Sequence, residues 1–291
     1  RLALSNKGRL PDLLVLTATP IPRTLTLTYY GDMDVSRLEE KPAGRQPIDT
    51  RTLPLSRLDE VQEALKRKVN TAEKTYWVCP LIEESEVVDL AAATARFEAL
   101  KKILGPSKVR LMHGRMKTAE RDEAMDDFIN GEADVLVATT VVEVGVDVKA
   151  ATLMVIEHAE RFGLAQLHQL RGRVGRSDKT SACLLLYQEP LGEMAKARLK
   201  MMRETNDGFR IAEEDLRLRG PGEMLGSRQS GLPGFRIADL AQHRDLLLAA
   251  RDDAQLILSK DADLQTPRGQ ALRHLLYLFQ YDRAIKTLRS G

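Results

Sequence analysis

The runs DVLVATT (134–140) and TLMVIEH (152–158) lie close together in the chain, and both are rich in β-branched and other apolar residues. Three similar runs flank them, namely TYWVCPLI (75–82), KVRLMHG (108–114) and SACLLLYQ (181–188). Short runs that are apolar on both faces and bounded by polar residues or glycine are typical of strands buried in a parallel sheet. Residues 75–190 are therefore expected to contribute five strands.

Amphipathic segments alternate with these runs, and we expect helices over residues 58–69, 87–104, 117–130 and 163–174. Alternating strands and helices indicate an α/β fold, because each right-handed crossover covers one face of a parallel sheet. The prediction is a doubly wound parallel sheet whose ligands bind at the carboxyl ends of the strands.

The flanks of this region differ from it in pattern. Residues 13–19 resemble one more strand, a helical stretch reaches residue 30, and prolines and glycines mark a connector near 40–50. After residue 190 the pattern is helical, with helices expected over 193–206, 211–219, 238–259 and 268–289 around a glycine-rich loop at 220–234. We therefore expect three parts: residues 1–45 as the end of a preceding domain with its linker, 46–190 as the α/β domain, and 191–291 as a helical hairpin, loop and C-terminal helices. A lone strand and helix cannot bury a core, so the chain is expected to be part of a longer protein.

Composition excludes several classes. The hydrophobic fraction of 43% suits a globular protein, and no run approaches the roughly 20 apolar residues of a membrane helix. Cys79 and Cys183 lie apart in apolar runs without ligand spacing, so core positions in a cytoplasmic protein and no metal site are expected. The net charge of +2 does not by itself indicate a nucleic-acid partner.

The sharpest local signal is QLRGRVGR (169–176). On a helix, Gln169, Arg173 and Arg176 would project from one face, and two guanidinium groups there suit the oxygens of a polyphosphate. Gly172 and Gly175 weaken a helix and indicate that another group approaches the backbone closely. The alternative is a solvated basic helix, which the glycines and the flanking apolar strands disfavour.

A second signal is VLVATTVVEVGVDV (135–148), in which a strand runs into polar residues. Hydroxyls and free backbone N–H groups just beyond a strand bind phosphate well. The residues of interest are Thr139, Thr140, Glu143, Gly145 and Asp147. The alternative is a buried strand followed by an ordinary turn.

Two further candidate sites lie at the ends of expected strands. LTATPIPR (16–23) places Thr17 and Thr19 before a proline turn, and LMHGRM (111–116) places His113, Gly114 and Arg115 before an expected helix that Thr118 would cap. A lone histidine at a strand end is more often structural than catalytic.

The last signal is RLKMMRETNDGFRIAEEDLRLRGPGEMLGSRQSG (198–231), a helical hairpin and a glycine-rich loop that contain Arg198, Arg219 and Gln229. A glycine-rich loop could instead cradle a nucleotide. However, no GxxxxGK[ST] pattern is present and no strand precedes the loop.

Taken in order, these segments resemble motifs of superfamily 2 helicases: residues 16–23 motif III, 135–148 motif V and 169–176 motif VI. The extension PIPR and the hairpin with its loop, which resembles the TRG element, narrow the resemblance to the RecG family and its relative, the transcription-repair coupling factor. YWVCPLIEESE (76–86) and Pro221 favour RecG.

The resemblance implies a RecA-like second motor domain of an ATP-dependent DNA helicase that acts on branched double-stranded DNA, such as stalled forks and Holliday junctions, in recombination and repair. It implies a monomer in the cytoplasm, associated with the nucleoid. It assigns Arg173, Arg176 and Gln169 to catalysis as arginine fingers and their neighbour. It assigns Gly145, Asp147 and Gly172 to the nucleotide. It assigns to DNA binding or coupling Thr17, Thr19, His113, Gly114, Arg115, Thr139, Thr140, Glu143, Arg198, Arg219 and Gln229.

Two patterns of a complete helicase are missing, since the sequence contains neither GxxxxGK[ST] nor a DExH-type segment. ATP with Mg²⁺ would therefore be bound mainly by a first motor domain outside this chain, which would belong with an N-terminal wedge domain. The chain alone is expected to be inactive. Two alternatives stay open: the motor of a coupling factor, and a non-catalytic nucleic-acid-binding module of the same fold.

Overall fold

The computed structural model describes residues 44–69, 71, 73–80, 86–139, 148–219 and 243–278, with the single positions 14, 16, 17, 36, 38 and 40. The chain divides into two units: Ser36–Met224, the larger, and Arg1–Val35 with Leu225–Gly291, the smaller.

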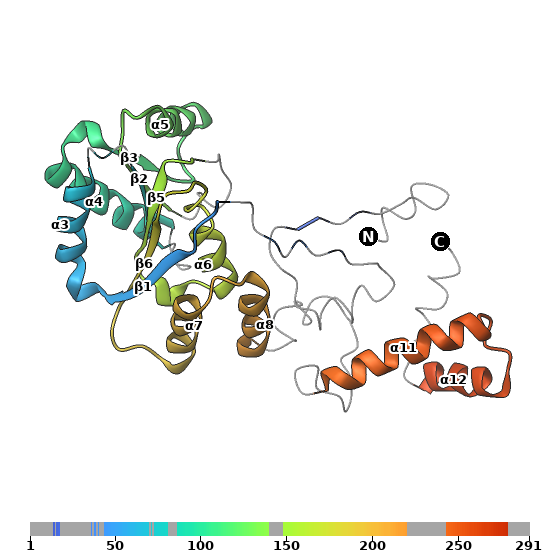
Figure 1. The fold of residues 1–291 in the computed structure, drawn as a ribbon. Helices are drawn as coiled ribbons and strands as arrows, with labels where there is room; N and C mark the ends of the chain where they lie inside the picture. Colours follow the sequence, from blue (N-terminus) through green and yellow to red (C-terminus); the bar gives the residue numbers. More distant parts are fainter. Residues whose placement is uncertain are drawn as a thin grey trace. The chain divides into compact units, whose positions relative to one another are not determined.

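The larger unit is built on a six-stranded sheet in the order β1-β6-β5-β2-β4-β3, and every neighbouring pair is parallel (Figure 1). The strands are β1 (Ile48–Pro54), β2 (Lys74–Val78), β3 (Val109–Met112), β4 (Val135–Ala138), β5 (Ala151–Ile156) and β6 (Ser181–Tyr187). The predicted doubly wound parallel sheet is confirmed.

Strand β1 was not predicted, because the sequence reading placed a connector near 40–50 and began the sheet at residue 75. β1 lies at the edge of the sheet and pairs only with β6 among the described strands, so its sequence IDTRTLP alternates between buried and exposed positions. A half-exposed edge strand lacks the continuous apolar run that identifies its neighbours.

Helices cover both faces of the sheet. They are α3 (Leu58–Lys68), α4 (Glu86–Leu104), α5 (Thr118–Asn130), α6 (Leu164–Arg171), α7 (Glu193–Glu204) and α8 (Gly208–Arg219). Three short 3-10 turns join elements, at Leu55–Arg57, Pro106–Lys108 and Ala159–Arg161. In Figure 1, α3 and α4 lie on one side of the sheet and α6 lies on the other.

Side chains alternate between the two faces along each strand, which explains why the sheet has a hydrophobic core on each face. Trp77 and Cys79 face the core beneath α3 and α4, whereas Tyr76 and Val78 face the core beneath α5 and α6. Because successive strand residues point to opposite faces, one fully buried strand supplies both cores.

The hairpin α7–α8 packs against the second of these cores. Leu199, Met202 and Ile211 are each at most 3% exposed, and they belong to the same buried cluster as Leu167 and Leu170 of α6. The two hairpin helices therefore share the hydrophobic core of the α/β sheet.

The N-cap of helix α5 lies one residue earlier than expected. Lys117, not Thr118, is the N-cap residue, and its backbone N–H donates to the Glu120 carboxylate at 3.0 Å. Glu120 thus satisfies a helix N-terminal donor from the third helical position.

The smaller unit contributes α11 (Arg244–Lys260) and α12 (Pro267–Leu278). The Asp261 carboxylate forms the turn between them, because it accepts from the backbone N–H groups of Gln265 and Thr266 and from the Thr266 hydroxyl. Gly269 is required beside this turn, since a Cβ there would lie 2.3 Å from an Asp261 carboxylate oxygen. The predicted helix 268–289 is observed as far as Leu278, and the rest lies outside the described residues.

Candidate functional site

Helix α6 presents Leu164, Leu167 and Leu170 to the core, and all three are fully buried. The helix ends at Arg171, and Gly172 is its C-cap residue, with a backbone N–H that donates to the His168 carbonyl at 3.0 Å. Arg173 and Arg176 therefore lie beyond the helix. The expected helical face shared by Gln169, Arg173 and Arg176 was wrong, because the helix was predicted to continue to residue 174.

Residues 172–176 form a turn that is held at several points. Gly175 has φ +71°, and a Cβ on it would lie 2.9 Å from Cγ1 of Ile48 in β1. The Arg176 Nε donates to the Gly172 carbonyl at 3.1 Å, and the Arg45 Nε donates to the Gly175 carbonyl at 3.0 Å. The group that approaches the Gly175 backbone is thus a side chain of the adjacent edge strand, and this turn positions both arginines.

Gln169, Arg173 and Arg176 are all half-buried, and each takes part in interactions with other groups. They lie within eight residues of chain at the end of α6 and in the turn that follows it. A fixed turn places the Cα atoms of both arginines in advance, so that less backbone freedom is lost when a guanidinium meets an anionic group.

A second group lies at the carboxyl ends of β3 and β4. The Thr139 N–H donates to the Met112 carbonyl at 3.2 Å, which brings Thr139 beside His113 as the parallel pairing predicts. Burial lowers the pKa of His113 and outweighs the opposing effect of Glu120, and the ring Nδ1 is buried without a hydrogen-bond partner among the described residues. Gly114 and Arg115 are exposed in the turn between β3 and α5.

The described structure does not position the remaining predicted residues, apart from Arg198, relative to this site. Thr17 is exposed and belongs to the smaller unit. Arg219 is the last residue of α8, and its side chain is outside the described residues. Also outside the described residues are Thr19, Thr140, Glu143, Gly145, Asp147 and Gln229.

Arg198 joins the hairpin to the α/β domain. Its Nη2 donates at 2.7 Å to the backbone carbonyl of Glu160, in the 3-10 turn that precedes α6. Burial of the Glu160 carboxyl would raise its pKa, but hydrogen bonds from His158 and from the Gln188 backbone outweigh this effect and hold the pKa below its usual value. The described bonds of Arg198 therefore stay within the protein.

The sequence analysis did not single out Arg171, which is only 2% exposed. Its Nη1 donates to the carbonyls of Met202 and Thr205, each at 2.8 Å, and its Nη2 lies 3.2 Å from the His168 Nδ1. A signal was present in the sequence, because position 171 follows Leu164 and Leu167 by seven and four residues and so lies on the buried face of α6.

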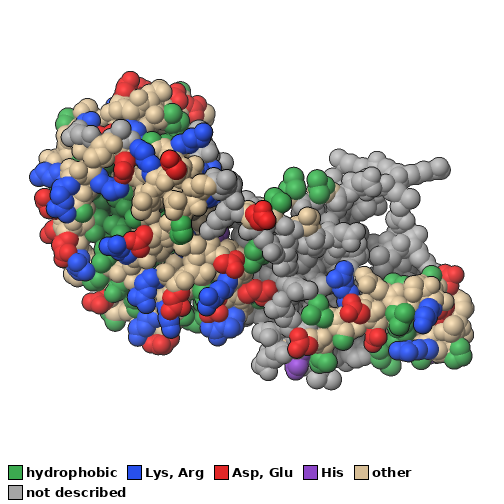
Figure 2. All heavy atoms as spheres, viewed as in Figure 1, with side chains coloured by type: hydrophobic (Ala, Val, Ile, Leu, Met, Phe, Trp, Pro, Cys, Tyr) green, Lys and Arg blue, Asp and Glu red, His purple; other side chains and the backbone are tan. Residues whose placement is uncertain are grey.

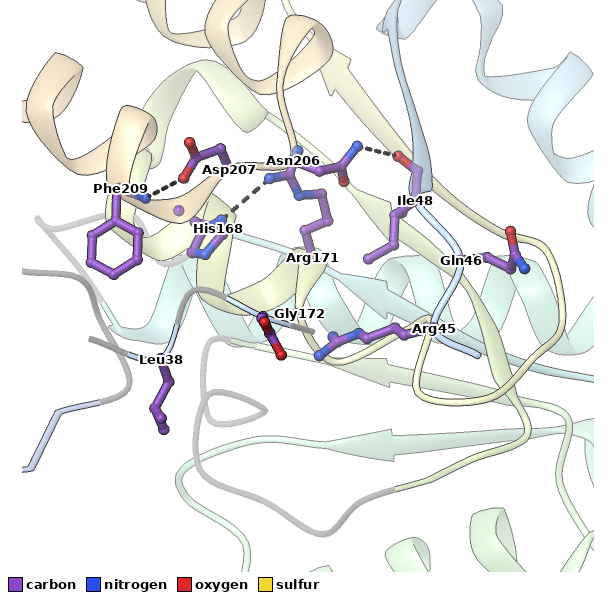
Figure 3. A pocket seen from close by; sticks show the side chains of 12 residues that line it. Leu38, Arg45, Gln46, Ile48, His168, Arg171, Gly172, Asn206, Asp207 and Phe209 are labelled. Atoms are coloured by element: carbon purple, nitrogen blue, oxygen red, sulfur yellow. Dashed lines mark hydrogen bonds between the residues drawn. The ribbon is translucent and has the colours of Figure 1, made fainter. Parts of the chain in front are cut away.

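A hollow of about 360 Å³ adjoins this arginine (Figure 3). Its lining comes from the segment before β1, the end of α6 and the turn between α7 and α8. The lining residues are Leu38, Glu40, Arg45, Gln46, Ile48, His168, Arg171, Gly172, Asn206, Asp207, Gly208 and Phe209. In the turn, the Asn206 side chain donates to the Ile48 carbonyl, and the Asp207 carboxylate accepts from the Phe209 N–H.

The described part of the chain contains neither a membrane-spanning helix nor a cluster of metal ligands. No helix there is long and apolar enough to cross a membrane. Within the same residues, no group of three or more His, Cys, Asp or Glu side chains is placed to hold a metal ion.

Two segments of the chain match models of known protein families. Residues 56–178 match the model of the helicase conserved C-terminal domain, and residues 205–282 match the model of ATP-dependent DNA helicase RecG, domain 3, C-terminal. The fold and the 169–176 segment thus define the C-terminal, RecA-like motor domain of a superfamily 2 helicase.

Similar proteins narrow the class of helicase. The chain is 51% identical over 263 residues to the ATP-dependent DNA helicase RecG of Acidithiobacillus ferridurans, covering 90% of this chain and 38% of that protein. It is 46% identical to the RecG of Bacillus subtilis, covering 94% and 40%. A solved structure of RecG bound to a three-way DNA junction superposes with a TM-score of 0.64 at 45% identity, covering 83% of this chain and 31% of that one. The chain belongs to the RecG family, whose C-terminal portion it matches, and it spans about two fifths of the length of these curated relatives.

Proposed function

We propose that this chain is the second motor domain and coupling hairpin of a RecG-type, ATP-dependent helicase that remodels branched DNA in recombination and repair. The proposal is supported by relatives that are named ATP-dependent DNA helicases and by a similar protein whose structure was solved on a three-way DNA junction. Such a protein would act in the cytoplasm, on the nucleoid, as a monomer.

The observation that carries the proposal is the fixed turn at residues 172–176. Its arginines follow a helix that is anchored in the core, so a nucleotide brought against this turn would meet two guanidinium groups whose backbone is already held in place. In this role Arg173 and Arg176 stabilise the negative charge that develops on the transferring phosphoryl group, and Gln169 lies one helical turn before Arg173.

ATP and Mg²⁺ would be held mainly by the first motor domain, which lies outside this chain. The sequence contains no GxxxxGK[ST] phosphate loop and no DExH-type segment, the two patterns that hold the phosphates and Mg²⁺ in such a domain. The chain's contribution is therefore to position cations against a phosphate that another domain holds.

DNA would be contacted at the carboxyl edge of β3 and β4. His113, Gly114, Arg115 and Thr139 gather at that edge, where parallel sheets bind ligands. A neutral His113, which burial favours, can donate one hydrogen bond from its ring N–H to a phosphate oxygen of the DNA backbone without adding charge.

The test is made in the intact protein with Arg173→Ala and Arg176→Ala. Loss of an arginine finger is expected to lower DNA-stimulated ATP turnover by on the order of 10³-fold or more, while the affinity for a forked DNA changes little. ATP turnover and fluorescence anisotropy of labelled junctions give the two readouts.

Arg67→Ala is the matched control, because Arg67 is exposed on α3, which packs on the opposite face of the sheet. It should leave turnover near the wild-type value. The present chain alone serves as the negative control for turnover. Near-normal kcat in either finger variant would contradict the assignment.

A further inference from the structure

The buried Arg171 guanidinium lies where three segments meet (Figure 3). It extends from the last residue of α6, and both of its 2.8 Å bonds end on backbone carbonyls at the end of α7, those of Met202 and Thr205. A longer contact of 3.4 Å reaches the Thr50 hydroxyl on β1. One side chain thus links the helix that precedes the 172–176 turn to the hairpin and to the edge strand.

None of the partners of Arg171 among the described residues is a carboxylate. The four described contacts of Arg171 are two carbonyls, one hydroxyl and one imidazole nitrogen. Burial lowers the pKa of Arg171, as expected for a cation taken out of water without a counter-ion. An apolar side chain of similar volume would fill this site at a lower desolvation cost, so simple packing does not explain an arginine here.

The position of the two carbonyls at the end of α7 explains why an arginine lies here. Met202 lies in the last turn of α7, and Thr205 is the C-cap residue of that helix. Carbonyls at a helix C-terminus lack intrahelical donors and lie at the negative end of the helix dipole, so a cation satisfies and stabilises them. Because both bonds start from the single nitrogen Nη1, the end of α7 cannot shift relative to α6 without breaking both.

The backbone of the same residue continues into the arginine-bearing turn. The next residue is Gly172, whose carbonyl accepts a hydrogen bond from the Arg176 Nε. Arg173 follows directly. A displacement of the turn is therefore passed to Arg171 through one peptide bond, and from Arg171 to the hairpin through two charge-assisted hydrogen bonds.

We propose that Arg171 is a positioning residue that makes the α7–α8 hairpin follow the turn that carries Arg173 and Arg176. Its role is to couple the nucleotide state to movement of the hairpin, without contact to nucleotide or DNA. This inference rests on the proposed helicase function.

The experiment uses the intact protein and measures base pairs of a DNA junction unwound per ATP hydrolysed. Arg171→Met keeps the volume but cannot bind the carbonyls, so we expect DNA-stimulated ATP turnover within about threefold of wild type and a fall of at least tenfold in the unwinding-to-turnover ratio. Arg171→Lys places one ammonium group near both carbonyls and is expected to recover at least half of the wild-type ratio.

Thr50→Val is the matched control, because at the same buried place it removes the 3.4 Å contact with Arg171 and a local 3.4 Å bond to the Ile48 carbonyl, but neither bond to the end of α7, and it should leave the ratio unchanged. If Arg171→Met does not fold, Arg171→Gln replaces it, since that neutral side chain is too short to reach both carbonyls, and the same fall in the ratio is expected.

Three results would overturn the proposal. The first is a neutral variant with a wild-type ratio, and the second is a proportional loss of turnover and unwinding, which a merely structural residue would give. The third is an Arg171→Lys variant that folds but recovers no more than Arg171→Met. Failure of the proposed function is distinct, because the wild-type protein itself would then show no DNA-stimulated turnover.

Discussion

Gly175 illustrates how single residues set the geometry of the motif. Its φ of +71° lies in the left-handed region, and the Ile48 side chain occupies the space that a Cβ would need. The sequence reading identified the glycine as a place of close approach, but it did not identify Ile48, because strand β1 had not been recognised. The sequence likewise did not identify the two carbonyl partners of Arg171 at the end of α7, which lie more than 30 residues away in the chain.

Gly175→Ala tests this geometry at the residue scale. A left-handed backbone costs an L-residue roughly 1–2 kcal/mol, and the contact with Ile48 adds to that cost, so the free energy of unfolding should fall by about 2 kcal/mol or more. Gly192→Ala is the control, because Gly192 has φ −70° and no neighbouring atom within 4 Å of its would-be Cβ. Thermal unfolding of both variants gives the comparison. Equal stability of the two variants would show that the turn does not have this conformation.

At the scale of elements, a buried ion pair joins two strands and a helix. The Glu157 carboxylate, just beyond β5, accepts from the Trp77 indole of β2 and from the Arg96 guanidinium of α4, whose Nη2 lies at 3.1 Å. The side chains of Arg96 and Glu157 are 17% and 9% exposed. This pair fixes α4 against the carboxyl ends of the two central strands, which is the edge where the predicted DNA contacts lie.

Glu157→Gln should destabilise the protein by about 3 kcal/mol, because Arg96 would keep its charge in a mostly buried place without a counter-ion. Chemical denaturation measures the loss. Glu193→Gln, which breaks the exposed pair with Lys196 on α7, is the control and should be neutral. A neutral Glu157→Gln variant would mean that solvent reaches Arg96 freely.

Most elements were predictable from the sequence because their apolar residues recur with the period of a strand or of a helix. Strands β2 to β6 and the helices between them agree with the expected segments to within a few residues, since apolar periodicity reports burial directly. Two departures have one cause: neither edge strand β1 nor the early end of α6 is marked by a run of apolar residues, and both depend on contacts with distant segments.

At the scale of the whole molecule, the hairpin is part of the α/β core. The sequence pattern changes at residue 190, yet Leu199, Met202 and Ile211 pack in the same cluster as the residues of α6. In the proposed function, a hairpin that shares its hydrophobic core with the α/β domain can transmit small displacements, because close-packed interiors have few voids to absorb them.

A chain that ends at residue 190 should therefore fold poorly, whereas a chain that ends at residue 219 should retain a cooperative transition. Removing three buried side chains at roughly 1.5–3 kcal/mol each removes an amount comparable to the whole stability of a typical domain. Circular dichroism during heating compares the two chains. If the shorter chain melts within a few degrees of the longer one, the hairpin is not part of this core.

The sequence by itself determined the class of fold, the order of the motifs and the RecG resemblance, because these depend on local periodicity and on short patterns of residues. Only the tertiary structure decided which groups meet: Ile48 against Gly175, Glu157 with Trp77 and Arg96, and Arg171 with the end of α7. The physical reason is that hydrogen bonds and steric contacts between distant segments leave little trace in the sequence around either partner.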